Sequence, residues 1–388
     1  MKIKELEITD IGCIHSLRLV FDDAMNVLCG PNGIGKTTII ESVASMFIQG
    51  IPTVKRNARC RQGSLKAKVE DNGRFQERSI EIKSFDPIDR VPTYSFSDLS
   101  AKVLSMKVGR YFEYSRLAAI PSDKPRELYD IWKETTSGVS FDEVKGWFVH
   151  RYLYSRVKGS LSEQQISNFR LSVECFSIVH PQYSFSRVMG ATNDIMVNTP
   201  NGEIFFEFLS SGFKSILFML LSTIKEIEFR FKDHGLKAEE FDGIILIDEV
   251  EIHLHPEWQE QVLSILRNTF PHAQFILTTH SPHVVQNAEP NEIMALELDE
   301  PSGNVVLRTD LPTKRHAFKG WTVEEILYDV MKMKSLRTEM YRKLRDEFDQ
   351  AVDNEDAEKA KSVFDELNEL LHPKNPERKL LQLQLAKI

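Results

Sequence analysis

The feature that most constrains this chain is a glycine-rich loop near its N-terminus. Residues 30–37 read GPNGIGKT and fit the pattern GxxxxGK[ST], in which glycines let backbone N–H groups wrap a phosphate at the start of a helix. An apolar, strand-like segment at 26–29 precedes the loop, and an apolar helical segment at 38–47 follows it. This is the strand–loop–helix setting that a phosphate site requires, so we favour it over a plain glycine turn.

The loop predicts a set of nucleotide ligands. Lys36 is expected to contact the β- and γ-phosphates, and the Thr37 hydroxyl is expected to contact Mg²⁺. The phosphate-binding set is Gly30, Pro31, Asn32, Gly33, Ile34, Gly35, Lys36, Thr37 and Thr38.

A second segment supplies paired carboxylates. Four aliphatic residues at 244–247 predict a buried strand that delivers Asp248 and Glu249 at its carboxyl end. We expect Asp248 to hold Mg²⁺ through water and Glu249 to polarise the attacking water. An isolated Asp-Glu pair is as often a solvated loop start, but the glycine-rich loop upstream favours the catalytic interpretation.

Two further segments suit the γ-phosphate. The string LSSGFKS at 209–215 opens a helical pattern, and the hydroxyls of Ser210 and Ser211, with Gly212, lie at the expected helix N-terminus. On its own this is a helix cap. His280 follows a second apolar strand at 275–278, where a phosphate sensor would lie, although a single histidine at a strand end is usually structural.

The remaining patterns predict an α/β protein with parallel central strands. Short β-like text at 51–114 predicts an antiparallel sheet, helical spacing at 141–157 and 162–179 predicts an inserted helical subdomain, and the chain after 320 is charged and helical. We divide the chain into an N-terminal lobe with the glycine-rich loop and a β lobe (1–116), the helical insertion (117–182), a C-terminal lobe with Asp248, Glu249 and His280 (183–312) and a helical region for assembly or partner docking (313–388).

Composition excludes several classes. The 49 Lys and Arg against 57 Asp and Glu give a net charge of −8, so the whole chain does not attract nucleic acid or an anionic membrane. Four widely spaced cysteines match neither a zinc site nor a disulfide framework. The first residues, MKIKELEITDIG, lack the apolar core of a signal peptide, so we do not expect export, and no apolar run reaches the ~20 residues that span a bilayer. We expect a cytoplasmic protein without membrane contact.

The chain carries the four motifs in the order glycine-rich loop, LSSGFKS segment, Asp248-Glu249 pair and His280, and in that order they resemble the ATP-binding-cassette (ABC) ATPases. The N-terminal strand pair at 3–21, the signature at 209–215 and the string DEVEIHLHP at 248–256 are most similar to the SMC/RecF/OLD-like branch, especially the small AAA-domain ATPases of anti-phage defence systems such as Septu and PARIS. The resemblance implies an ABC-type P-loop ATPase head, a mixed α/β sheet core with an antiparallel β lobe. It further implies ATP and Mg²⁺ as cofactors, and Lys36, Glu249 and His280 as catalytic residues.

The same resemblance implies a composite site. The signature of one subunit, through Ser211 and Gly212, would complete the nucleotide site of another, so we expect at least a head-to-tail homodimer. His253 and His255 would lie in the D-loop at the subunit interface, where packing is favoured over a metal site. The family's Q-loop glutamine is not evident near 111–116, and that ligand stays open.

Three functions compete at this level. The first is a defence ATPase that controls a separately encoded effector, such as a nuclease. The second is a RecF-like repair ATPase that binds DNA directly, for which the basic stretch at 55–61 with Lys66 and Lys68 offers phosphate contacts, although an ordinary strand face is equally consistent. The third, a transporter's nucleotide-binding subunit, is disfavoured by LSSGF in place of LSGGQ. Outside these three, a self-contained nuclease is disfavoured by the helical C-terminal region.

Overall fold

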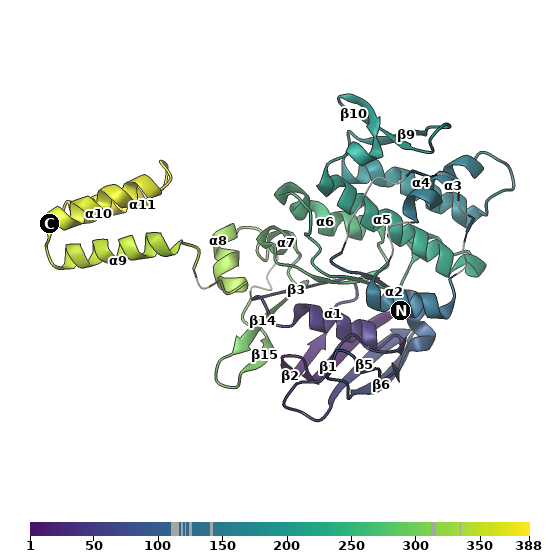
Figure 1. Cartoon of the computed structure of the whole chain (residues 1–388), viewed down its shortest axis with the longest axis horizontal. Coiled ribbons are helices and arrows are strands. Elements are labelled where there is room, and N and C mark those ends of the chain that lie inside the picture. The colour runs from purple at the N-terminus through teal and green to yellow at the C-terminus, as the bar shows by residue number, and fades with distance from the viewer. Residues whose placement is uncertain are drawn as a thin grey trace. The chain divides into compact units, whose positions relative to one another are not determined.

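The computed structural model describes residues 1–109, 116–117, 119–120, 122–123, 126–139, 143–311, 316–333 and 335–388. The chain forms two compact units, Met1–Lys332 and Met333–Ile388, each with its own core. The first unit contains all the motifs above (Figure 1). The four-part division made from the sequence stays a prediction.

A six-stranded sheet forms the centre of the first unit, in the order β15-β14-β3-β13-β12-β8. The five strands from β14 to β8 are parallel, and β15 pairs antiparallel with β14 at the edge. Their bounds are β3 (Met25–Cys29), β8 (Val103–Met106), β12 (Ile244–Ile247), β13 (Gln274–Thr278), β14 (Ile293–Asp299) and β15 (Asn304–Leu307). The parallel central strands are confirmed, and the carboxyl ends of β3, β13 and β12 therefore lie side by side.

One strand corrects the sequence-based prediction. Residues 51–114 were expected to lie in an antiparallel sheet, but β8 pairs in parallel with β12 and joins the central sheet. All four residues of β8 are buried. Such a short apolar run shows no alternation of exposed and buried side chains, so its sequence does not indicate which sheet it enters.

A separate four-stranded antiparallel sheet has the order β2-β1-β5-β6. Its strands are β1 (Lys2–Ile11), β2 (Ile14–Val20), β5 (Gly63–Asp71) and β6 (Arg74–Ile82). The strand pair and the antiparallel lobe are thus confirmed. Asn72 and Gly73, both at positive φ, form the tight turn between β5 and β6, as asparagine and glycine in a hairpin predict. A short pair, β4 (Gln49–Gly50) and β7 (Thr93–Tyr94), lies beside this lobe.

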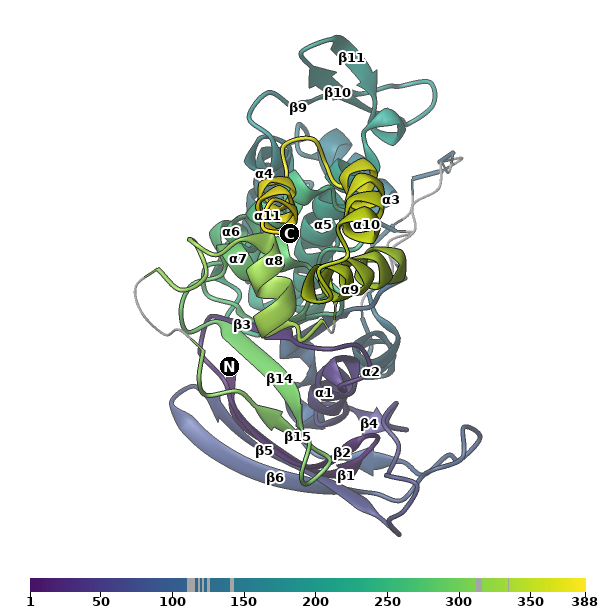
Figure 2. The ribbon, with the colours of Figure 1, turned by 90° about the vertical axis from the view of Figure 1, so that its left-hand side faces the viewer.

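Helix α1 (Lys36–Ser45) packs between the two sheets (Figure 2). Its Ile39 and Val43 share one core cluster with Leu6 of β1 and with Leu246 and Ile276 of the central sheet. The intervening residues of the same central strands face the other way. The central sheet is therefore apolar on both faces, as a sheet covered by helices on one side and by α1 with the β lobe on the other requires.

The helices of the opposite face come from three regions of the chain. Phe148, Phe176 and Leu217 belong to one cluster with Ile245 and Leu277 of the sheet. The elements on this side are α3 (Val144–Tyr154), α4 (Glu163–Val179), the small sheet of β9 (Ser184–Val188), β10 (Ile195–Thr199) and β11 (Gly202–Phe205), then α5 (Ser211–Arg230) and α6 (Pro256–Thr269). Helix α2 (Leu128–Ser137) lies at the β8 edge of the sheet and contacts α1. Figure 1 shows α1 and α5 on opposite sides of the central sheet.

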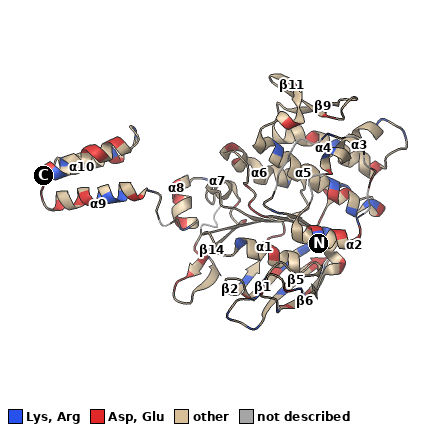
Figure 3. Ribbon diagram, viewed as in Figure 1, with Lys and Arg blue, Asp and Glu red and all other residues tan. Residues whose placement is uncertain are grey.

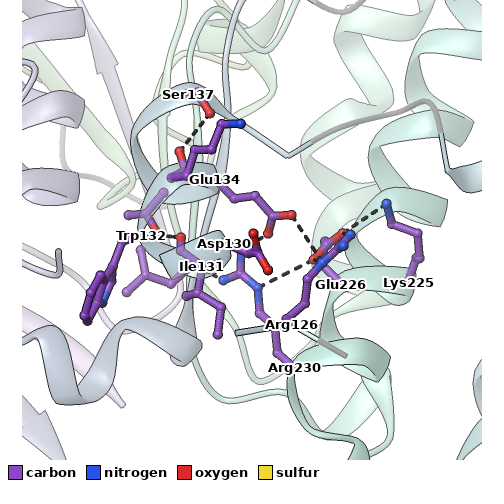
Figure 4. A network of polar contacts seen from close by, with 12 residues as sticks. Arg126, Asp130, Ile131, Trp132, Glu134, Ser137, Lys225, Glu226 and Arg230 are labelled. Carbon is purple, nitrogen blue, oxygen red and sulfur yellow. Dashed lines mark hydrogen bonds and ion pairs between the residues drawn. The ribbon is translucent and has the colours of Figure 1, made fainter. Parts of the chain in front are cut away.

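A buried ionic network ties α5 to the chain around α2 (Figure 4). Arg126 donates to both carboxylate oxygens of Glu226, Nη2 at 2.6 Å from Oε1 and Nε at 3.0 Å from Oε2. Lys225 Nζ lies 3.0 Å from Glu226 Oε1, and Arg230 Nη2 lies 2.7 Å from Glu134 Oε2. The Glu226 side chain is fully buried, so the middle of α5 is fixed by charge pairs as well as by apolar packing.

The segment after the last strand covers the central sheet near β3. Phe318 and Ile326 pack with Cys29 and with Val285 of α7 (Pro282–Asn287). This segment contains α8 (Val323–Glu325) and a π-helical turn, Ile326–Val330. The apolar set after Gly320, which the sequence left open between covering the core and binding another protein, therefore covers the core as far as Val330.

The second unit is a three-helix arrangement of α9 (Glu339–Asp353), α10 (Ala357–Leu370) and α11 (Glu377–Leu385). Phe348, Leu367 and Leu381, one from each helix, form its core. Across the described ranges of both units, no helix combines the length and the apolar character needed to cross a bilayer. The cytoplasmic location expected from the sequence stays a prediction.

Candidate nucleotide site

The glycine-rich loop connects β3 to α1 in a conformation that requires glycine. Gly30, Gly33 and Gly35 have φ of 137°, 76° and 101°. A Cβ atom on Gly30 would lie 2.4 Å from the backbone oxygen of Leu296, so no larger residue fits without displacing β14. The loop therefore brings backbone N–H groups to the N-terminus of α1, which suits an anion.

Lys36 lies inside this loop. Its Nζ donates to the backbone oxygens of Gly30 and Pro31, each at 2.9 Å. Burial lowers the pKa of Lys36, against the opposing influence of Cys29 and Glu251. The ammonium thus lies at the loop's centre, where phosphate oxygens would accept hydrogen bonds from it. Together, the loop amides and Lys36 form a set of donors that fits a nucleotide phosphate chain.

The expected magnesium ligands are brought together from distant parts of the chain. Thr37 Oγ1 lies 3.2 Å from Asp248 Oδ1, across 211 positions of sequence. Asp248 follows β12 directly and is 2% exposed, and its backbone N–H donates to Met106 O of β8 at 3.0 Å. A hydroxyl and a carboxylate are the oxygen ligands that Mg²⁺ prefers, so these residues fit the ion.

Glu249 turns the chain away from the strand. It has φ of 48°, which is uncommon for a residue with a side chain, and its carboxylate is half-buried. Its backbone N–H donates to Thr278 Oγ1 at 2.7 Å, and the next N–H, of Val250, donates to Thr278 O at 3.0 Å. The acid is therefore held at the carboxyl edge of the sheet by the end of β13.

His280 is placed by its backbone, while its side chain is exposed. Its N–H donates to Glu251 Oε1 at 2.5 Å, and Thr279 Oγ1 donates to Glu251 Oε2 at 2.8 Å. One carboxylate after β12 thus binds two consecutive residues after β13. This fixes the distance between the segment carrying Glu249 and the segment carrying His280.

The signature residues lie elsewhere. Ser210 caps α5, accepting from Phe213 N at 3.3 Å, and Ser210 and Ser211 are exposed. Gly212 packs against the turn after β12: a Cβ there would lie 3.0 Å from Trp258 and 3.4 Å from the backbone oxygen of His253. Among the described residues, no hydrogen bond joins this motif to the glycine-rich loop of the same chain.

Two residues of this site were given no role by the sequence. Thr278 of β13 forms hydrogen bonds with the residues after β12, and Glu251 after β12 accepts from the residues after β13. Both contacts exist because the two strands are neighbours. Thr278 and Glu251 stand in the sequence segments LTTH and DEVE, but these segments alone do not predict which residues the two side chains contact. Residues 111–115, where the Q-loop glutamine was sought, lie outside the described residues.

The basic stretch after β4 is largely used within the protein. Lys55 Nζ donates to Asp86 O at 3.0 Å, and the Arg56 guanidinium stacks on Phe85. Lys66 pairs with Glu77 at 2.8 Å. Figure 3 shows Lys and Arg interspersed with Asp and Glu over the first unit. These contacts favour the ordinary strand face over a phosphate-binding patch.

The D-loop histidines also show no metal-like arrangement. In the ranges that the structure describes, no three His, Cys, Asp or Glu side chains are grouped as a metal site. His253 has φ of 65°, and its backbone oxygen contacts Gly212. The turn that carries His253 therefore lies against the N-terminus of α5, and the interface role of His253 and His255 stays a prediction.

Comparison with known proteins identifies relatives along the full length. The profile described as "AAA domain, putative AbiEii toxin, Type IV TA system" matches residues 196–286, and a second AAA-domain profile matches 5–144. A Septu protein PtuA from Bacillus thuringiensis is 42% identical over 388 residues, covering 99% of this chain and 98% of that protein. A Septu protein PtuA from Bacillus mycoides (strain KBAB4) is 23% identical over 84% of this chain and 44% of its own length.

More distant likenesses cover parts of the molecule. The Retron Ec83 probable ATPase of Escherichia coli is 32% identical over 117 residues, which is 30% of this chain and 21% of that protein. Among solved structures, an Smc head bound to the C-terminal winged-helix domain of ScpA has a TM-score of 0.48 and 12% identity, covering 79% of this chain and 98% of that one. The SMC head domain from Thermotoga maritima has a TM-score of 0.43 and 14% identity, with the same coverage.

Proposed function

Because this chain belongs to the Septu PtuA family, whose members are ATPases of anti-phage defence, we propose that it dimerises head to tail around ATP and Mg²⁺ and thereby controls a separately encoded nuclease. The family membership supports the ATPase and its place in defence. The dimer, the nuclease and the residue roles below are the proposal.

Within one subunit, each residue of the site has a distinct task. The loop amides and Lys36 bind the phosphate chain and neutralise its charge. Thr37 and Asp248 would hold Mg²⁺, and the ion would neutralise further charge during phosphoryl transfer. Glu249 orients and polarises the attacking water, and His280 contacts the γ-phosphate from the end of β13.

The position of the signature motif carries the dimer proposal. Helix α5 lies on the opposite face of the central sheet from α1 (Figure 1). Ser210 and Ser211 nevertheless remain exposed at its N-terminus, where backbone N–H groups and the helix dipole favour an anion. A second subunit facing the first would bring this terminus to the partner's γ-phosphate, and the reverse would hold by symmetry.

The test exploits the two ends of the composite site. Ser211 is the first residue of α5, so Ser211→Asp adds a carboxylate where the helix dipole favours one and leaves α5 intact. The same carboxylate would repel the partner's γ-phosphate, and we expect ATPase activity to fall by at least ~10-fold. Lys36→Ala should abolish nucleotide binding. Ser264→Asp, the same change at an exposed position on α6, is the control.

Mixing the two defective chains separates the arrangements. In a mixed dimer, one composite site carries both defects and the other carries neither, so activity should partly recover. If Ser211→Asp and Lys36→Ala chains form verified mixed dimers and activity does not recover, the site is not shared between subunits.

The second unit is the proposed docking module for the nuclease. It has its own core, yet α11 exposes Leu380 and Leu383 at 61% and 63% and lies beside Arg345 of α9. A chain ending at Lys332 should bind ATP normally and fail to co-purify with the nuclease encoded beside it. Retained co-purification would place docking on the first unit.

A further inference from the structure

We propose that Thr278 is a positioning residue that sets the magnesium-binding carboxylate and the water-polarising glutamate with a single hydroxyl. Thr278 is the last residue of β13 and is 1% exposed. Its Oγ1 donates to Asp248 Oδ1 at 2.7 Å and accepts the backbone N–H of Glu249, also at 2.7 Å. The inference rests on the proposed roles of Asp248 and Glu249.

The hydrogen-bond inventory of a threonine explains why this arrangement orients both acids. A hydroxyl has one proton to donate and lone pairs to accept with. Here the proton goes to the carboxylate and a lone pair receives the N–H, so the two bonds have fixed directions. The acceptor is a carboxylate oxygen of a residue that is 2% exposed, so water does not compete for this bond.

The two hydroxyls on Asp248 Oδ1 have different tasks. Thr37 approaches that oxygen from α1 at 3.2 Å and is itself a proposed magnesium ligand. Thr278 approaches from the neighbouring strand at 2.7 Å, where Thr278 and Asp248 each follow the last registered pair of the two strands. Thr278 therefore orients the metal-binding carboxylate of Asp248 without itself binding the metal or the nucleotide.

The second bond acts on the conformation of Glu249. A glutamate at φ of 48° is held there by its surroundings, because an L-residue disfavours this region by about 1–2 kcal/mol. The bonds from Glu249 N and Val250 N to the side chain and backbone of Thr278 fix both peptide groups around that turn. Removing the hydroxyl leaves one of these N–H groups without its acceptor.

The experiment compares Thr278→Val, which keeps the shape and removes the hydroxyl, with Thr278→Ser, which keeps the hydroxyl. We expect Thr278→Val to lower kcat by ~10- to 100-fold, with a smaller change in KM for ATP, and Thr278→Ser to restore most of it. The matched control is Thr269→Val. Thr269 is also 1% exposed, and its hydroxyl bonds to Ile265 O within helix α6.

A binding readout tests the metal directly. ATP raises the unfolding temperature of a protein that binds it, and the Mg²⁺ concentration giving half of that rise reports the ion's affinity. Thr278→Val should shift this concentration upward by ~10-fold, while Thr278→Ser and Thr269→Val stay near the wild type. Wild-type kcat and Mg²⁺ midpoint in Thr278→Val, or equal losses in Thr278→Val and Thr278→Ser, would overturn the proposal.

Two parallel variants separate this inference from the proposed site. Asp248→Asn and Glu249→Gln remove the acids themselves. If either keeps full ATPase activity, the proposed roles fail. If both lose activity while Thr278→Val keeps it, the roles stand and the positioning inference alone is wrong.

Discussion

Replacing Glu226 with alanine tests whether the network between α2 and α5 holds the first unit together. The carboxylate is fully buried and accepts two hydrogen bonds from Arg126, with Lys225 Nζ at 3.0 Å and Arg230 Nε at 3.7 Å. Alanine at this position leaves three buried cations to share the two remaining carboxylates, Glu134 and Glu143.

The expected loss follows from what is left behind. Breaking a buried ion pair by removing one partner destabilises by about 3–5 kcal/mol, mostly because the other charge stays desolvated. The unfolding entropy of a unit the size of Met1–Lys332 is about 0.7 kcal/mol/K at the midpoint, so this loss corresponds to a Tm shift of ~4–7 °C.

Differential scanning calorimetry of the wild type, Glu226→Ala and Glu240→Ala measures this shift. Glu240 is 55% exposed and pairs with Lys237 at 3.8 Å, so its loss should change stability by less than about 0.5 kcal/mol. Equal Tm values for all three proteins would refute the claim that the buried network stabilises the first unit.

The same network predicts that the difference in folding stability between wild type and Glu226→Ala depends on pH. Burial acts to raise the pKa of Glu226, but Lys225, Arg126 and Arg230 outweigh it and hold that pKa below its ordinary value. A depressed carboxyl pKa stabilises the fold above the unfolded pKa of ~4.3, and this contribution is lost as pH falls toward the folded pKa. The stability gap between the two proteins should therefore narrow below about pH 4, and a gap that widens there would contradict the sign.

Three further outcomes follow from the site. Glu249→Gln should bind ATP and Mg²⁺ but slow steady-state hydrolysis by at least ~10²-fold, and near-normal turnover would exclude its role. A chain ending at Lys332 should keep ATP-dependent thermal stabilisation. A chain ending at Leu311 should lose it, because Phe318 and its neighbours no longer cover β3, and equal stabilisation of both chains by ATP would contradict that packing. Glu251→Gln should lower kcat by ~10-fold with little change in Tm, since it weakens the tie between the segments after β12 and β13.

What the sequence predicted best were local patterns. The glycines and Lys36 identify the phosphate loop because each depends on near neighbours in the chain, and the run at 244–247 predicts a strand whose end must carry Asp248 to the sheet edge. The meeting of Thr37 and Asp248 follows once both strands are parallel. The catalytic, metal-binding and signature roles of these residues stay predictions until the variants are measured.

What the sequence could not predict was the order of strands. β8 is four buried residues whose partner, β12, lies about 140 positions later, so nothing local distinguishes it from the antiparallel lobe. The tasks of Thr278 and Glu251 have the same origin, since both depend on β13 lying beside β12. Helix α1 starts at Lys36 rather than at 38, because the loop's last glycine, Gly35, already acts as its N-cap.

The strand order also sets when the nucleotide site can appear during synthesis. β13 lies between β3, which leads into the phosphate loop, and β12, which leads into Asp248 and Glu249. These two strands therefore cannot be joined in one sheet until β13, which ends at Thr278, has left the ribosome. That is about 250 residues after Cys29, or roughly 12–50 s at ~5–20 residues per second. Throughout that interval ATP cannot stabilise the nascent chain, and the exposed edge of β3 is open to pairing with other chains. Chaperone dependence should therefore be greatest for ribosome-bound chains that stop before β13 and fall once β13 has emerged.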